Sequence, residues 1–231
     1  MGLLDTLLGR SKPVRPNLDA LFALPSAAVT LQTSAGLVLS GHAGVCWMPP
    51  AGQSPADVQR EISELLDIAD DPLGAGQPTA EAGEAPAAGD PATAPGAAAV
   101  APTGASGGKA GLLRQAEDAF GYRWLLLDDP DVEDLVNRVH LVNSLLAEQG
   151  WGPQLLCSVF GVVPGSDADS TARPFYLVYL FKRGTFYPFA PDGKDHRDNE
   201  LELRVRALLG SDLPIEQDLA RWFPLWDLPV R

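Results

Sequence analysis

The side chains best suited to chemistry are two cysteines and three histidines. A thiol activated by a neighbouring histidine is the arrangement that a thiol-dependent hydrolase uses. Cys46 or Cys157 would be the nucleophile, with His42 or His140 as the base. No local motif joins them, and Cys157 lies in the apolar run LLCSVF, where a thiol is normally unreactive. A thiol-dependent hydrolase therefore stays an alternative interpretation.

Metal-ligating residues do not fall into a recognised pattern. A structural zinc site needs four clustered ligands at characteristic spacings, and only His42 and Cys46 lie close together in the sequence. The segment 192–200, DGKDHRDNE, gathers carboxylates, but Lys194 and Arg197 stand where a calcium loop needs an acidic residue and a glycine. The sequence predicts no metal, no cofactor and no catalytic residue.

Aromatic side chains gather in two clusters late in the chain. These are KRGTFYPFAP at 182–191 and RWFPLWDLPV at 221–230. Tyrosine and tryptophan supply rigid contact area at protein interfaces, although large aromatic residues also pack in cores. We predict that the residues in contact with a partner are Arg183, Phe186, Tyr187 and Phe189. The second candidates are Trp222 and Trp226.

The net charge restricts the class of partner. The chain has 231 residues, with 17 Lys and Arg against 30 Asp and Glu, which gives a formal net charge of −13. Nucleic-acid binding would need a basic surface, and anionic lipid would repel such a chain. The sequence has no apolar run long enough to span a membrane, and its first residues lack the form of a secretory leader. We expect a cytoplasmic protein that binds no nucleic acid.

The first fifteen residues allow one further interpretation. Four leucines share one stripe of a short helix, and three basic residues follow them. Such a segment could lie against lipid headgroups, which would make the protein a peripheral membrane sensor through residues 1–15. The residues that would contact the membrane are Leu3, Leu4, Leu7 and Leu8.

A change of composition divides the chain. Residues 72–110 contain 14 alanines, 8 glycines, 6 prolines and no aromatic residue. Such a segment buries too little apolar surface to offset the entropy lost on ordering, so it predicts a disordered linker or insertion. Residues 1–71 would make a marginal fold alone. We therefore predict that residues 1–71 and 111–231 form one domain, which the linker interrupts.

The expected elements make an α+β domain. Runs of β-branched and aromatic residues predict strands at 27–32, 37–39, 45–47, 122–127, 155–163, 175–181 and 185–189, the first two as a hairpin. Helical spacing and end signals predict helices at 54–69, 112–120, 130–149, 199–209 and 214–223. Asp129 and Pro130 would begin the third helix, and Pro188 would place its strand at an edge or at a bulge. Short loops between strands favour a mainly antiparallel sheet covered by helices.

At this level of detail the chain resembles a known family. Five of its segments are similar to the PspA-associated protein PspAB family. They are the opening MGLLDTLLGRSKPVRPNLDALFAL, the segment GVCW, EDLVNRVHLVNSLLAEQGWGPQLLCSVF, FYLVYLFKRGTFYPFAP and RDNELELRVRALLGSDLPIEQDLARWFPLW. The resemblance covers both blocks on either side of the linker. It carries no catalytic residue that could be transferred to this chain.

The resemblance implies a role in envelope stress. The family occurs in actinobacteria and haloarchaea, beside the phage-shock protein PspA and an HtpX-like membrane protease. Either protein is therefore an expected partner. The order of elements also resembles secretion-chaperone-like domains, whose members bind proteins. The leading hypothesis is a non-enzymatic adaptor or chaperone-like module that docks a peptide or helix on a sheet edge or aromatic groove. The alternatives are the hydrolase, an accessory enzyme of the protease, and the membrane sensor.

Overall fold

The computed structural model describes residues 16–48, 114–118 and 120–230. Three expectations lie outside these residues: the stripe of Leu3, Leu4, Leu7 and Leu8, the helix at 54–69, and the linker at 72–110. The division of the chain at 72 and 110 therefore stays a prediction.

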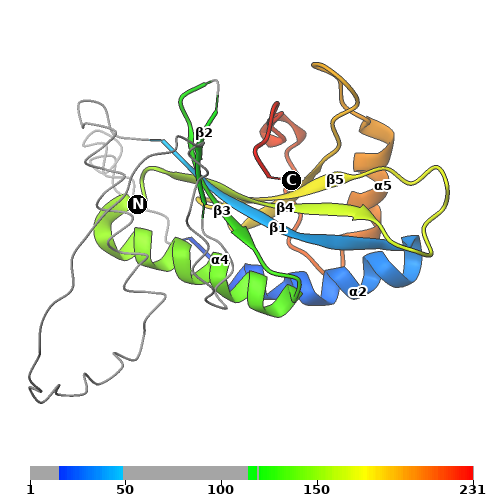
Figure 1. Cartoon of the computed structure of the whole chain (residues 1–231), viewed down its shortest axis with the longest axis horizontal. Coiled ribbons are helices and arrows are strands. Elements are labelled where there is room, and N and C mark those ends of the chain that lie inside the picture. The colour runs from blue at the N-terminus through cyan, green and yellow to red at the C-terminus, as the bar shows by residue number, and fades with distance from the viewer. Residues whose placement is uncertain (1–15, 49–113, 119, 231) are drawn as a thin grey trace, which may run out of the picture.

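A six-stranded antiparallel sheet forms the centre of the molecule (Figure 1). Its strand order is β2-β3-β1-β4-β5-β6, so β1 lies between two strands that follow it far along the chain. The strands are β1 (Leu37–Trp47), β2 (Arg114–Glu117), β3 (Arg123–Asp128), β4 (Leu155–Pro164), β5 (Phe175–Leu180) and β6 (Thr185–Phe189). β6 is an outer strand, which confirms the edge position predicted from Pro188.

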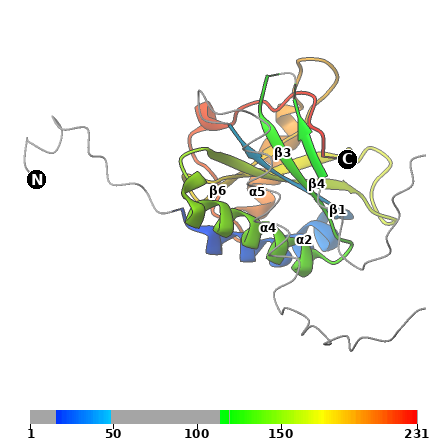
Figure 2. The same cartoon turned by 60° about the vertical axis from the view of Figure 1, so that its left-hand side comes forward.

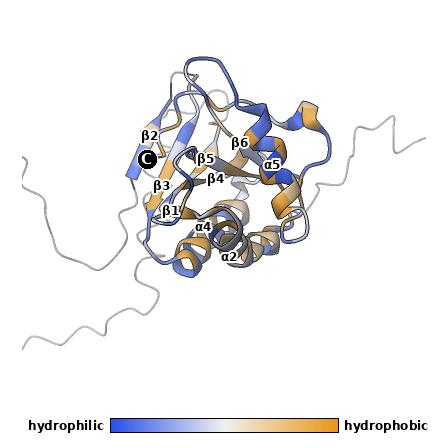
Figure 3. Cartoon of the chain, turned by 90° about the vertical axis from the view of Figure 1, so that its right-hand side faces the viewer, coloured by the Kyte–Doolittle hydropathy of each residue, from blue (hydrophilic) through white to orange (hydrophobic). Residues whose placement is uncertain are grey.

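Helices cover one face of this sheet, and the C-terminal segment lies on the other (Figures 1 and 2). The helical layer consists of α2 (Leu24–Ala35) and α4 (Val132–Leu146). The short helix η1 (Leu18–Ala23) precedes α2, and η2 (Ala147–Trp151) follows α4. Figure 3 shows α2 and α4 side by side below the sheet, with α5 (Asn199–Leu209) beside β6. The α+β class with an antiparallel sheet is confirmed.

The strand register explains why the sheet is apolar on both faces. Cys46 of β1 is opposite Trp124 of β3 and Cys157 of β4, so these three side chains share the face under the C-terminal segment. The intervening residues Val45 and Ser158 face the helices. Because both layers exclude water, β3 is buried at four consecutive positions, Trp124 to Leu127.

The helix predicted from Asp129 and Pro130 begins two residues later. Asp131 is its N-cap, since its carboxylate accepts hydrogen bonds from the backbone N–H groups of Glu133 and Asp134. Asp129 accepts instead from the N–H of Asp131 and stabilises the turn before the helix. Asp198 caps the N-terminus of α5 in a similar way, because its side chain accepts a hydrogen bond from the N–H of Leu201.

The hairpin predicted at 27–32 and 37–39 is wrong. Residues 27–32 belong to α2, whose buried positions Leu24, Ala27 and Leu31 follow helical spacing. The strands predicted at 37–39 and 45–47 are two ends of the single strand β1. A shift of register between Leu39 and Ala43 contains Gly41, which has a φ of +78°.

Two predicted helices are also wrong. Within 112–120, residues Arg114–Glu117 form β2 and pair with β3. Within 214–223, only Leu219–Arg221 form a single turn, η3. Pro214 and Glu216 instead exchange backbone hydrogen bonds with Phe186, at 2.9 and 2.7 Å. Pairing with β6 therefore replaces the helix that local composition favoured.

Candidate binding pocket

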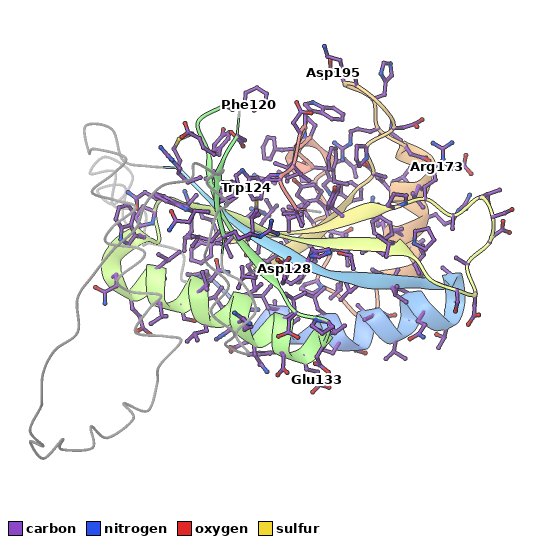
Figure 4. All side chains as sticks on the ribbon, in the orientation of Figure 1. Phe120, Trp124, Asp128, Glu133, Arg173 and Asp195 are labelled. Carbon is purple, nitrogen blue, oxygen red and sulfur yellow. The ribbon has the colours of Figure 1, made fainter. Side chains whose placement is uncertain are left out.

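An apolar pocket of about 440 Å³ opens between the sheet and the C-terminal segment. It lies on the face of the sheet opposite the helices. Figure 4 shows Phe120 at the tip of the β2–β3 turn and Trp124 beneath it, towards the sheet. The pocket is lined by Cys46, Asp118, Phe120, Tyr122, Trp124, Leu156, Cys157, Leu180, Tyr187, Phe223, Pro224, Leu225, Trp226 and Leu228. A largely apolar lining with few polar groups is typical of ligand and peptide sites.

The first wall is the β2–β3 turn, which Asp118 organises. Its Oδ1 accepts hydrogen bonds from the N–H groups of Phe120 and Tyr122, at 2.9 and 3.0 Å. Its Oδ2 accepts from Nε1 of Trp124 at 3.0 Å. One carboxylate thus fixes both the backbone of the turn and the indole ring below it. Because these bonds set the positions of three aromatic residues, this wall of the pocket is preorganised.

The second wall is the C-terminal segment, which β6 holds in place. The Tyr187 hydroxyl donates to the carbonyl of Phe223 at 2.8 Å, and its ring stacks on Trp222 with centroids 5.9 Å apart. Burial raises the pKa of Tyr187, so the hydroxyl remains a donor throughout the physiological range. Trp226 packs edge-on against Phe189, at 5.3 Å between centroids. Aromatic contacts therefore position this wall on the sheet.

Two phenylalanines at the pocket are exposed. Phe120 has 64% of its surface accessible and Phe223 has 57%, and both line the pocket. Large exposed apolar side chains beside an apolar pocket are a feature of protein interaction sites. Neither residue was among those predicted from the sequence to contact a partner. For Phe120 the available signal was the turn sequence between Asp118 and Gly121, directly before a strand of large apolar residues.

The floor of the pocket contains both cysteines. Cys46 and Cys157 are directly opposite each other in β1 and β4, and both line the pocket. A hydrogen bond with the Cys157 side chain, together with burial, raises the pKa of the Cys46 thiol. Both thiols are free. The floor therefore contains two neighbouring free thiols rather than a disulfide.

Most of the aromatic residues predicted as contacts lie in the core. Phe186 and Phe189 are fully buried, and Tyr187 and Trp222 are 1% and 6% exposed. Phe186 and Phe189 therefore pack in the core of this structure, and a contact of either with a partner stays a prediction. Tyr187 and the half-buried Trp226 differ, because they line the pocket.

Arg183 is the exposed member of the predicted group, and the structure gives it an intramolecular partner. Its side chain is 44% exposed and donates to the carboxylate of Glu216, which is itself buried. Thr185 donates to the same carboxylate at 3.0 Å. The contacts of Arg183 and Thr185 with Glu216 hold the segment after α5 against the start of β6. Arg183 lies outside the pocket lining, and a contact with a partner there stays a prediction.

The structure does not bring the predicted cysteine–histidine pairs together. His42 Nδ1 is 2.6 Å from Asp128 Oδ1, and His140 Nε2 is 3.8 Å from Asp19 Oδ1. Asn143 of α4 donates to Ser158 of β4 at 2.9 Å. Since consecutive strand residues point to opposite faces, Cys157 points away from the helix that carries His140. His140 is thus not a base for this thiol.

The described residues contain neither a cluster of metal ligands nor a membrane-spanning helix. Within residues 16–48, 114–118 and 120–230, no three His, Cys, Asp or Glu side chains converge as ligands of a metal ion. No helix in the same ranges has the length and hydropathy needed to cross a bilayer.

The chain matches a known protein family. The family model described as PspA associated protein B matches residues 1–81 and 103–230. The unmatched residues 82–102 fall inside the alanine- and proline-rich segment. No curated protein and no solved structure matches the chain significantly.

Proposed function

The chain belongs to the PspA associated protein B family, and on this basis we propose that it is an adaptor that binds PspA through the aromatic pocket. The observation that carries this proposal is the pair of exposed phenylalanines, Phe120 and Phe223, beside an apolar pocket of about 440 Å³. The family description names an association with PspA, and the pocket offers a surface on which such an association can take place.

The chemistry of the pocket favours an apolar side chain as its ligand. Its walls are mostly aromatic or aliphatic, and two of its polar side chains, Asp118 and Tyr187, already have partners within the protein. Asp118 accepts three hydrogen bonds, and the Tyr187 hydroxyl donates to a backbone carbonyl. Since these polar groups need no further partner, binding would be driven by burial of apolar area. An apolar anchor on a helix or extended segment of the partner fits such a site.

The proposal has three further parts, which concern catalysis, localisation and a second partner. The protein would act without catalysis, in keeping with a family description that names an association and no reaction. It works in the cytoplasm as part of the envelope-stress response. An HtpX-like membrane protease is a second candidate partner for the same surface, and the binding experiment below distinguishes it from PspA.

Replacing the exposed phenylalanines tests the proposal. We expect the double substitution Phe120→Ala and Phe223→Ala to weaken binding to purified PspA about 30-fold, because loss of an interface hot spot costs about 2 kcal/mol. Both side chains are more than half exposed, so the fold should remain intact. Calorimetric titration of the full chain with PspA, and separately with the protease, measures the effect.

Phe22 supplies a matched control. It is an exposed phenylalanine, with 48% of its surface accessible, but it lies on the helical layer and stacks on His140. Phe22→Ala should leave the affinity unchanged. If Phe22→Ala weakens binding and the double variant does not, the helical face carries the interaction. If the unaltered protein binds neither PspA nor the protease, the adaptor proposal fails.

A further inference from the structure

We propose that Cys46 and Cys157 are a modification site, which a peroxide converts reversibly into a disulfide between β1 and β4. The two residues are 111 positions apart in sequence but directly opposite in the sheet. This inference concerns the thiols themselves and does not depend on which partner the pocket binds.

The strand register places the thiols within bonding range. Residues directly opposite in antiparallel strands have Cα atoms about 4.5–5.5 Å apart, and disulfides span Cα separations of about 4.4–6.8 Å. The side chains of such a pair point to the same face of the sheet. The strands need no change of register for the bond to form. The register shift immediately after Cys46 gives the backbone local freedom to adjust.

The pocket supplies a route to the sulfur atoms. Both cysteines line it, although their exposed fractions are only 2% and 6%. A small neutral oxidant such as hydrogen peroxide can enter an apolar pocket of about 440 Å³. Larger thiol reagents have to pass the aromatic walls. We therefore expect peroxide to react with the folded protein, and bulky aromatic disulfides to react much more slowly.

The reaction balances without another component. One thiol attacks an oxygen of the peroxide, which breaks the O–O bond, releases water and leaves a sulfenic acid. The second thiol then displaces hydroxide from that sulfur, and the S–S bond forms with release of a second water. Two thiols lose two electrons and two protons. Because the second thiol is the nearest neighbour of the first, it competes effectively with further oxidation. A dithiol reductant reverses the bond by exchange.

Burial also sets the pH dependence of the rate. The raised pKa of Cys46 keeps that thiol protonated at neutral pH, and the thiolate is the reactive form. Asp118, from the β2–β3 turn, contributes to the shift, and two further titratable side chains of the pocket lining are Tyr122 and Tyr187. The disulfide should therefore form slowly near neutral pH and faster as the pH rises.

Intact mass and peptide mapping of the full chain test the proposal. The reduced protein is treated with hydrogen peroxide, and its remaining thiols are then alkylated in denaturant. We expect a loss of two hydrogens, one cross-linked peptide pair containing both cysteines, and full recovery after dithiothreitol. Cys46→Ser and Cys157→Ser should each gain oxygen on the remaining thiol instead of losing two hydrogens.

Any of three results would overturn the inference. The first is that both thiols stay fully alkylatable at a peroxide concentration that oxidises the unfolded chain. The second is that the unaltered protein gains oxygen without an S–S bond, and the third is that the cross-link joins two chains rather than one. The main readout uses the unaltered protein, so a serine variant that fails to fold does not prevent the test.

Discussion

Glu216 shows how one buried carboxylate can hold a segment to a sheet edge. It is 3% exposed, and it accepts hydrogen bonds from Arg183, Thr185 and the N–H of Asp218. Burial alone would raise its pKa. The three donors outweigh burial and hold the pKa below its ordinary value. Glu216 therefore stabilises the folded state as a charged group.

Replacing this carboxylate should destabilise the protein. We expect Glu216→Gln to lower the free energy of unfolding by about 2–3 kcal/mol at pH 7, because a charged hydrogen-bond partner is lost and its donors remain. Since the folded-state pKa is depressed, the contribution is complete above the ordinary glutamate pKa of about 4.3 and is lost as the pH falls through the folded value. Urea unfolding at neutral and acidic pH measures both effects.

A surface glutamate provides the comparison. Glu200 pairs with Arg204 in α5, but their side chains are 83% and 70% exposed. Such pairs contribute little, so Glu200→Gln should change the free energy of unfolding by less than about 0.5 kcal/mol. Equal effects of the two substitutions would show that Glu216 has no special role.

At the residue scale, the sequence predicted that aromatic side chains form the candidate site, but it did not predict which of them line the pocket. Aromatic residues do form the candidate site, but burial separates those that line the pocket from those that pack beneath it. Phe186 and Tyr187 are adjacent, and they face opposite sides of the sheet. Their roles depend on what covers each face, which a local pattern does not specify. The opposition of Cys46 and Cys157 was likewise not visible, because it depends on the pairing of distant strands.

At the scale of elements, Gly36 joins the helical layer to the sheet. It ends α2 with a φ of +64°, and a Cβ built on it would lie 2.7 Å from the backbone of Ala168. Its carbonyl also accepts a hydrogen bond from Gly165 at 2.8 Å. Both the backbone angle and the available space therefore require glycine at this position.

Alanine at this position should be costly. We expect Gly36→Ala to lower the free energy of unfolding by about 3 kcal/mol, from strain at positive φ and from the clash with backbone. Gly193 has a φ of +81° with no atom within 4 Å of a built Cβ, so Gly193→Ala should cost only about 1 kcal/mol. Urea unfolding of both variants separates the two causes. A similar cost for both would mean that the loop at Ala168 moves freely.

The element predictions failed where tertiary contacts override local preference. The segment AAVTLQT contains β-branched residues, yet it forms a helix because Leu24, Ala27 and Leu31 bury one stripe. The segment after Pro214 was expected to be helical, yet it pairs with β6. Strands with strong apolar runs, such as β4 and β5, were predicted closely because their own composition already favours burial on both faces.

At the scale of the whole molecule, the charge imbalance affects stability. A net charge of −13 places mutually repelling carboxylates on one compact body. We expect the melting temperature at pH 7 to rise by a few degrees when salt increases from low to physiological ionic strength, because screening shortens the range of this repulsion. Differential scanning calorimetry measures the change. The effect should disappear near the isoelectric point of about 4.5, and a salt-independent melting temperature at pH 7 would contradict it.

The overall class was accessible from the sequence, whereas the strand order was not. Short connections between apolar runs predicted an antiparallel sheet with helices on it, as found. The position of β1 between β3 and β4 depends on contacts over more than 70 residues. No local pattern encodes such a pairing, because it is selected by the packing of the complete sheet.

The central position of β1 has a consequence for synthesis on the ribosome. Trp47, its last residue, is made 117 residues before Pro164, the last residue of β4. At about 5–20 residues per second, this strand waits roughly 6–23 s for its second neighbour. Both edges of β1 are open until β3 is made, and one edge stays open until β4 is made, a form that other nascent chains can pair with. We therefore expect the yield of folded protein to depend on fast elongation or on chaperones that cover this edge.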